Sequence, residues 1–102
     1  MTASTISFAG YTFNGDKGCF TCQHVMDGTP VLLFVHEPDG DLQFMCGASD
    51  HDFAEQCKFL HTAHVLEWQP DLLLLPTVDF GFEAERSDVS SPWVVSRSQQ
   101  YY

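Results

Sequence analysis

The clearest pattern in the chain is a set of short apolar runs separated by turn residues within residues 23–47. Residues 31–37 form the most strand-like run, and residues 19–26 and 42–46 flank it, with Gly, Pro or Asp at the boundaries. Apolar runs with such turns between them indicate β-strands joined as hairpins. We therefore expect an antiparallel meander centred on residues 31–37.

Two more segments alternate between apolar and polar residues. Residues 6–13 do so weakly, with Gly10 placed for a bulge, and residues 78–86 alternate cleanly, as expected of a half-buried strand. Residues 92–95 can pack as an edge strand or an anchor. These segments extend the predicted sheet on either side of the meander.

A helical period replaces the strand pattern at residues 49–61. The apolar stripe at positions i, i+4 and i+7 consists of Phe53, Cys57 and Leu60. Residues 62–68 fit either a helix or a strand, and Pro70 can open a short helix that ends at residue 75. The expected fold class is α+β, an antiparallel β-meander sheet with one main helix packed on a face.

Length and charge narrow the function classes. With 102 residues the chain predicts one domain over residues 1–102, with residues 1–5 and 96–102 as loose ends. Four basic residues against 14 acidic ones give a net charge of −10. Such a surface repels phosphate groups, so we expect no nucleic-acid partner and no anionic membrane. A basic protein or a cation is the natural ligand; the alternative is that the charge serves only solubility.

Other features of the sequence bear on its location and assembly. No apolar run approaches the roughly 18–20 residues that span a bilayer, and residues 1–10 lack the basic and apolar regions of a secretory signal. We expect a cytoplasmic protein, whose four cysteines are then thiols or metal ligands. A homodimer is a further expectation, because so small a sheet leaves edges to cover.

The cysteines suggest one zinc site by their spacing. The C-x₂-C and C-x₃-H pairs that would form a Cys₃His site are Cys19, Cys22, Cys57 and His61. The 34 residues between the two pairs exceed the usual interval, and the first pair lies in a strand-like run without a knuckle. The alternative is that the cysteines are small core residues.

A second group, formed by Cys22, His24, Cys46 and His51, can be tested against the predicted hairpins. Turns at residues 27–30 and 38–41 would pair residues whose numbers sum to 57 and to 79. His24 and Cys46 would then lie two strand spacings apart, roughly 9–10 Å. We therefore expect these side chains to be spread over one sheet face, with His24 buried and hydrogen-bonded, and to form no metal site.

Catalytic signatures are absent from the sequence. There is no phosphate-binding loop, no EF-hand and no cysteine-protease motif. We expect a protein that is not an enzyme and has no cofactor, with zinc as the alternative.

Acidic residues form the remaining candidate site. Asp39 and Asp41 lie at a turn, while Asp79, Glu83 and Glu85 would share the outer face of the last long strand. That face can dock a basic protein; the alternative is an ordinary solvated face whose charges protect the sheet edge.

Several short motifs over residues 19–93 resemble a family of small uncharacterised bacterial domains that is sometimes grouped with the immunity proteins of polymorphic toxin systems. The motifs are Cys22-Gln23-His24-Val25, Asp39-Gly40-Asp41, Phe44-Met45-Cys46-Gly47, Asp50-His51, Pro70-Asp71-Leu72, Gly81, Glu85-Arg86 and Pro92-Trp93. The resemblance implies an α+β domain with an antiparallel sheet and no established enzymatic activity. Together with the charge, it leads us to expect a protein-binding, immunity-like function, with a zinc-binding protein as the alternative.

Overall fold

The computed structural model describes residues 5–46 and 57–98. Within these ranges the chain forms eight strands, two α-helices and one 3-10 helix. In chain order the elements are β1 (Thr5–Phe8), β2 (Tyr11–Asn14), β3 (Gly18–Cys22), α1 (Gln23–Met26), β4 (Leu33–His36), β5 (Leu42–Met45), β6 (Cys57–His61), α3 (Thr62–Trp68), the 3-10 helix η1 (Pro70–Leu74), β7 (Phe82–Glu85) and β8 (Val94–Arg97).

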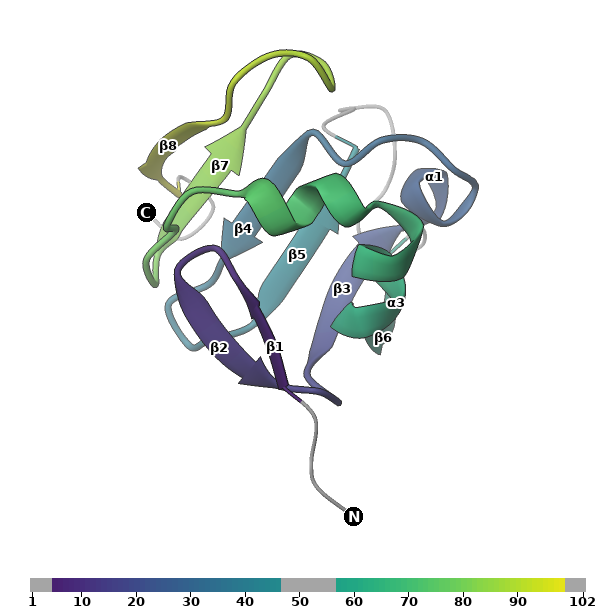
Figure 1. Ribbon diagram of the computed structural model, residues 1–102, viewed down its shortest axis with the longest axis vertical. Coiled ribbons are helices and arrows are strands. Elements are labelled where there is room, and N and C mark those ends of the chain that lie inside the picture. The colour runs from purple at the N-terminus through teal and green to yellow at the C-terminus, as the bar shows by residue number, and fades with distance from the viewer. Residues whose placement is uncertain (1–4, 47–56, 99–102) are drawn as a thin grey trace.

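Six of the strands form one mixed sheet in the order β6-β3-β5-β4-β7-β8, and β1 pairs with β2 in a separate hairpin. Neighbouring strands in the large sheet are antiparallel except β3 and β5, which are parallel. The α+β class is confirmed, while the sheet is antiparallel only in part. Figure 1 shows the β1–β2 hairpin, α3 and η1 lying across one face of this sheet.

The core lies between that face of the sheet and the elements that cover it. Phe34 and Phe44 are paired across β4 and β5, and their ring centroids are 5.0 Å apart. Phe8, from the β1–β2 hairpin, packs on both rings at 5.6 and 5.8 Å. Val65 of α3 and Leu72 of η1 are fully buried in the same cluster, so the hairpin and the helices share one core with the sheet.

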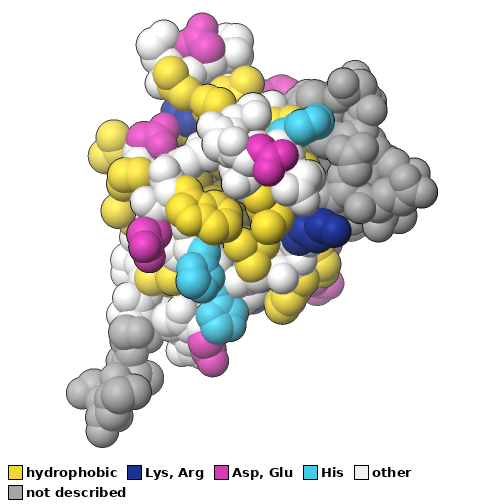
Figure 2. All heavy atoms as spheres, turned by 90° about the vertical axis from the view of Figure 1, so that its right-hand side faces the viewer, with side chains coloured by type: hydrophobic (Ala, Val, Ile, Leu, Met, Phe, Trp, Pro, Cys, Tyr) yellow, Lys and Arg dark blue, Asp and Glu magenta, His cyan; other side chains and the backbone are white. Residues whose placement is uncertain are grey.

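The side of the molecule that carries α1 and α3 has a mixed surface. Figure 2 shows hydrophobic side chains gathered near the centre of this side, with acidic side chains spread around them.

The predicted strand at residues 19–26 is wrong in its second half. β3 ends at Cys22, and the chain turns at once into the single helical turn α1. This turn ends in a Schellman motif, in which the N–H of Thr29 donates to the carbonyl of His24 and the N–H of Gly28 donates to that of Val25. Gly28 takes the left-handed conformation that the motif requires, with φ of 107°.

The predicted helix at residues 49–61 is wrong over residues 57–61. Residues 49–56 lie outside the described part of the chain, and Cys57–His61 is strand β6, paired antiparallel with β3. Long-range pairing with β3 therefore decides the structure of this segment over its local helical period. Of the neighbouring predictions, the helix of η1 is confirmed, and the ambiguous residues 62–68 are helix α3.

Two segments near the ends of the described chain differ from expectation. The weak strand at residues 6–13 is a tight hairpin, which turns at Ala9 and Gly10 with φ of 55° and 83°. Residues 96–97, expected in a loose tail, belong to edge strand β8, and Ser98 is buried.

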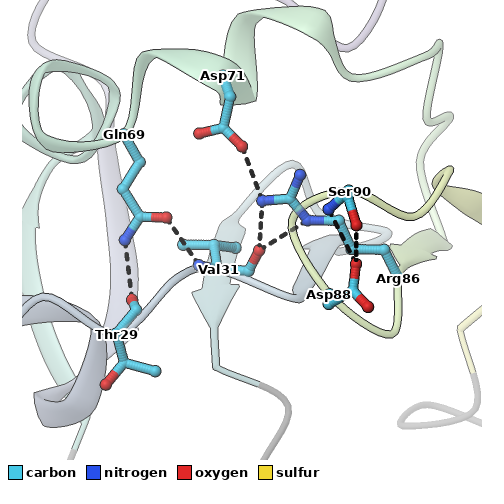
Figure 3. Close-up of polar contacts among 7 residues, drawn as sticks. All are labelled: Thr29, Val31, Gln69, Asp71, Arg86, Asp88 and Ser90. Carbon is cyan, nitrogen blue, oxygen red and sulfur yellow. Dashed lines mark hydrogen bonds and ion pairs between the residues drawn. The ribbon is translucent and has the colours of Figure 1, made fainter.

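One buried cation ties the start of β4 to the rest of the molecule. The guanidinium of Arg86 donates two hydrogen bonds to the carbonyl of Val31, at 3.2 and 2.9 Å, and pairs with Asp71 at 2.8 Å. Its Cζ atom lies 4.2 Å from the ring centroid of Trp93. We call these four residues the Arg86 anchor; Figure 3 shows its polar contacts beside the side chain of Gln69, which bridges Thr29 and Val31.

Candidate metal centre

Two cysteines and a histidine meet where β3 and β5 end. Each of Cys22, His24 and Cys46 offers one ligand atom, and the three atoms all lie within 4.8 Å of one another. The Sγ atom of Cys46 is 3.4 Å from Nδ1 of His24. Both cysteines are buried and His24 is half-buried. We call these three residues the thiol–imidazole cluster.

The parallel pairing of β3 with β5 brings the two thiols together. Phe20 pairs with Gln43 and Thr21 with Phe44. Both strands therefore run in the same direction, and their C-terminal ends lie side by side. Cys22 is the last residue of β3, and Cys46 directly follows β5. Neighbouring strands lie about 4.8 Å apart, which places side chains at adjacent strand ends within reach of one ion.

The turn of α1 supplies the imidazole. Because the chain becomes helical at Gln23, His24 is folded back beside the end of β3 instead of continuing along the sheet. The Schellman motif, which uses the carbonyl of His24 itself, fixes this turn. The position of the ring therefore depends on a local hydrogen-bond pattern and not on a sheet register.

One distance in the cluster agrees with the ligand lengths of zinc. Tetrahedral coordination with Zn–S of about 2.3 Å and Zn–N of about 2.0–2.1 Å puts sulfur and nitrogen about 3.6 Å apart. The separation between the Cys46 sulfur and the His24 nitrogen is 3.4 Å. Thiolate and imidazole ligands together suit zinc better than calcium or magnesium, which prefer oxygen ligands.

This arrangement corrects the register argument made from the sequence. β3 and β4 do not pair, because β5 lies between them, so the pairs summing to 57 do not form. In the β4–β5 hairpin the paired numbers sum to 78 instead of 79, as for Leu33 with Met45. The expected separation of His24 from Cys46 is therefore wrong, while His51 lies outside the described residues.

The slip of one residue has a local cause. The N–H of Glu37 donates to the carbonyl of Asp41, so three residues form the loop, and Gly40 takes a φ of 99°. Three-residue hairpins of this kind carry a glycine in the left-handed region. A slip of one position moves every paired side chain to the other face, which puts Phe44 on the face of Phe34.

The other four-residue set, Cys19, Cys22, Cys57 and His61, is arranged along two paired strands. Cys22 pairs with Cys57, and Gly18 pairs with His61. Cys19 and Cys22 are three positions apart on β3, so alternation directs their side chains to opposite faces. Burial raises the pKa of the Cys19 thiol to about 11, which keeps it protonated near neutral pH.

The acidic candidates divide into three places. Carboxylate oxygens of Glu37, Asp39 and Asp41 lie within 4.8 Å of one another at the β4–β5 turn. Glu83 and Glu85 alternate along β7 and share one face. Asp79 precedes β7 and accepts a hydrogen bond of 2.6 Å from the hydroxyl of Tyr11, which raises the pKa of that tyrosine.

One sequence signal could have located the cluster. Asp27-Gly28 after a possible helical turn is a C-terminal helix cap, because glycine is the usual residue just beyond the cap. With a cap at this position, residues 23–26 form a helical turn, and the preceding strand ends at Cys22. The preceding strand is then free to pair elsewhere, although its parallel partner still has no local signal.

Searches of the chain against protein-family models, curated proteins and solved structures found no match. Within residues 5–46 and 57–98, no helix is long and apolar enough to cross a membrane.

Proposed function

We propose that the protein binds zinc through Cys22, His24 and Cys46. The observation that supports this proposal is the convergence of two sulfurs and one ring nitrogen within 4.8 Å of one another. Three protein ligands leave one tetrahedral position for a further ligand. The metal would join the end of β3, the turn of α1 and the end of β5.

A metal in this place would act first on stability. Its ligands come from β3, α1 and the residue after β5, which an unfolded chain does not hold together, so the binding free energy adds to the free energy of folding. Deprotonated thiols are required, and zinc affinity is therefore expected to fall as the pH is lowered.

Metal analysis of untagged protein, purified without a chelator and supplied with zinc, tests the proposal. We expect about one zinc per chain in the wild type and a loss of binding in Cys46→Ser and His24→Ala. Cys19→Ser and His61→Ala are the matched controls, and both are expected to keep the metal. Less than about one zinc per two wild-type chains would contradict a stable site.

The controls also distinguish the two cysteine sets. Loss of zinc in Cys19→Ser and His61→Ala, with retention in Cys46→Ser, would move the site to the set that includes Cys57. If a variant fails to fold, cobalt bound to the wild type gives the answer, since its thiolate absorption bands report the number of cysteine ligands.

We propose as a second candidate function the binding of a basic protein, immunity-like in the sense of the family that the sequence resembles. The net charge of −10 and the shared face of Glu83 and Glu85 support it. The convergence of Asp39 and Asp41 with Glu37 adds a second concentration of negative charge. Complementary charge would mainly raise the association rate and select the partner.

A basic toxin domain encoded by a neighbouring gene would be the probe for the second candidate. We expect slower association with added salt, and slower association for Glu83→Lys with Glu85→Lys. Asp16→Lys, an exposed charge reversal in another turn, serves as the control. Equal rates in all three proteins would remove the acidic face of β7 from the binding surface.

A further inference from the structure

A groove lies where the two α-helices end. Its cavity has a volume of about 320 Å³, and it is lined by Val25, Met26, Asp27, Gly28, Trp68 and Gln69. We call this the helix-end groove. It belongs to the side of the molecule shown in Figure 2, which carries α1 and α3.

Two large apolar side chains of the groove are open to solvent. Trp68 is 47% exposed and Met26 is 39% exposed. No heavy atom lies within 4 Å of the place that a Cβ atom on Gly28 would occupy. The indole and the thioether are therefore accessible to a ligand that enters beside Gly28.

The groove carries a fixed negative charge. Asp27 is exposed, and its Oδ1 atom accepts a hydrogen bond of 3.0 Å from the side chain of Gln23, one turn earlier. This contact holds the carboxylate at the end of α1. A cation that enters the groove meets a charge already in position.

Both helices end at this groove. Asp27 is the C-cap of α1 and Gln69 is the C-cap of α3. The last carbonyls of α1 already accept the hydrogen bonds of the Schellman motif, so the carboxylate of Asp27 supplies the negative charge. The groove thus combines an aromatic side chain and a carboxylate.

The walls of the groove are fixed to each other by Gln69. Its side-chain amide donates to the carbonyl of Thr29, and its side-chain oxygen accepts from the N–H of Val31 at 2.7 Å. These two bonds join the end of α3 to the loop after α1, as Figure 3 shows. A ligand need not order either wall.

The Arg86 anchor shows how this chain holds a cation elsewhere. There the guanidinium lies over the ring of Trp93, pairs with Asp71 and donates to the carbonyl of Val31. The helix-end groove presents two of these kinds of group, the indole of Trp68 and the carboxylate of Asp27, around an open cavity. An indole and a carboxylate together favour guanidinium groups.

We infer that the helix-end groove binds a cationic side chain of a basic protein segment, with Trp68 as the aromatic face and Asp27 as the counter-charge. The net charge of −10 favours the approach of such a segment. The inference does not depend on zinc. It names one contact for the second candidate function, and its test uses a small molecule, so either can fail without the other.

The test is a titration of the ¹⁵N-labelled protein with acetyl-arginine amide, followed by the indole N–H signals of Trp68 and Trp93. Acetyl-citrulline amide, the neutral isostere, is the matched control ligand, and the salt concentration is held constant. We expect a saturable shift of the Trp68 signal with the arginine compound alone. The Trp93 signal should stay in place, because that ring is already covered by Arg86.

Two variants sharpen the result. Asp27→Asn is expected to weaken binding by about two- to fivefold, as for exposed ion pairs, and Asp16→Asn should leave it unchanged. Equal shifts with the citrulline compound would show an apolar site and overturn the inference. Equal movement of the Trp93 signal, or unchanged binding in Asp27→Asn, would also overturn it.

Discussion

The Arg86 anchor and the thiol–imidazole cluster lie at the same end of neighbouring strands in the sheet, yet they differ in chemistry. The backbone of Leu32 links their strands, since its carbonyl accepts from the N–H of Arg86 and its N–H donates to the carbonyl of Met45. In the anchor, guanidinium donors meet oxygen acceptors and opposite charges cancel. In the cluster, two sulfurs and a ring nitrogen come together, and all three are metal-ligand atoms.

This difference separates packing from binding. Donors matched to acceptors explain the burial of Arg86 without any ligand. In the cluster, Sγ of Cys46 and Nδ1 of His24 form a hydrogen bond of 3.4 Å, and all three atoms that meet there are zinc ligands, so one cation could bind them together. Both regions are buried, so burial does not distinguish a packing contact from a ligand site. The chemical types of the atoms that meet in each region do distinguish them.

The largest expected effect comes from breaking the anchor. Arg86→Leu leaves the carbonyl of Val31 without its charged donor and removes the contact with Trp93, so we expect the free energy of unfolding to fall by about 3 kcal/mol. Urea unfolding measures it. Asp71→Asn is the control, and because Asp71 is 43% exposed it should cost about 1 kcal/mol or less. If both variants lose the same free energy of unfolding, the ion pair and not the contact with the Val31 carbonyl gives the anchor most of its stabilising effect.

The next effect concerns the cluster and its metal. Free zinc at about 100 times its dissociation constant should stabilise the wild type by about 2.7 kcal/mol. Thermal unfolding with zinc and with a chelator gives the comparison. Cys46→Ser should show no zinc-dependent shift, whereas Arg86→Leu should keep it. If zinc does not change the unfolding temperature of the wild type, the cluster is a packing contact like the anchor and not a metal site.

A smaller effect is expected at the buried cysteine that belongs to neither region. Burial raises the pKa of Cys19 to about 11 in the folded chain, against 9.0 as the reference value. The unfolded chain therefore loses this proton first, and the stabilising effect of the neutral thiol is lost as the pH rises above 9. We expect about 1.4 kcal/mol less stability at pH 10 than at pH 8 from this group.

Unfolding of the wild type and of Cys19→Ala at both pH values isolates this contribution. The variant should lose less stability over that interval. Parallel losses in the two proteins would show that other groups cause the alkaline dependence.

The strands with strong local patterns could be predicted from the sequence. Residues 31–37 and 42–46 contain β4 and β5, and the turn between them was marked by Pro38 and Gly40. These assignments depend on neighbouring residues only. The predicted register of the same hairpin is wrong by one position. The backbone hydrogen bond from Glu37 to Asp41 closes a loop of three residues, whereas the prediction assumed a loop of four.

Pairing between distant strands could not be predicted. Nothing in residues 18–22 indicates a parallel partner at residues 42–45 or an antiparallel one at residues 57–61. Such contacts form only in the finished sheet, where Cys19, Thr21 and Cys22 of β3 become buried. The three cluster residues were recognised as candidate ligands, but the geometry that unites them depends on this pairing and on the turn at Cys22.

The strand order also bears on folding during synthesis. All three cluster residues are made by residue 46, and so are the adjacent central strands β3, β5 and β4. A nascent chain of that length lacks β6 and β7, the outer neighbours of β3 and β4. It would carry two open strand edges, which are prone to pair with other chains until residues 57–85 emerge from the ribosome.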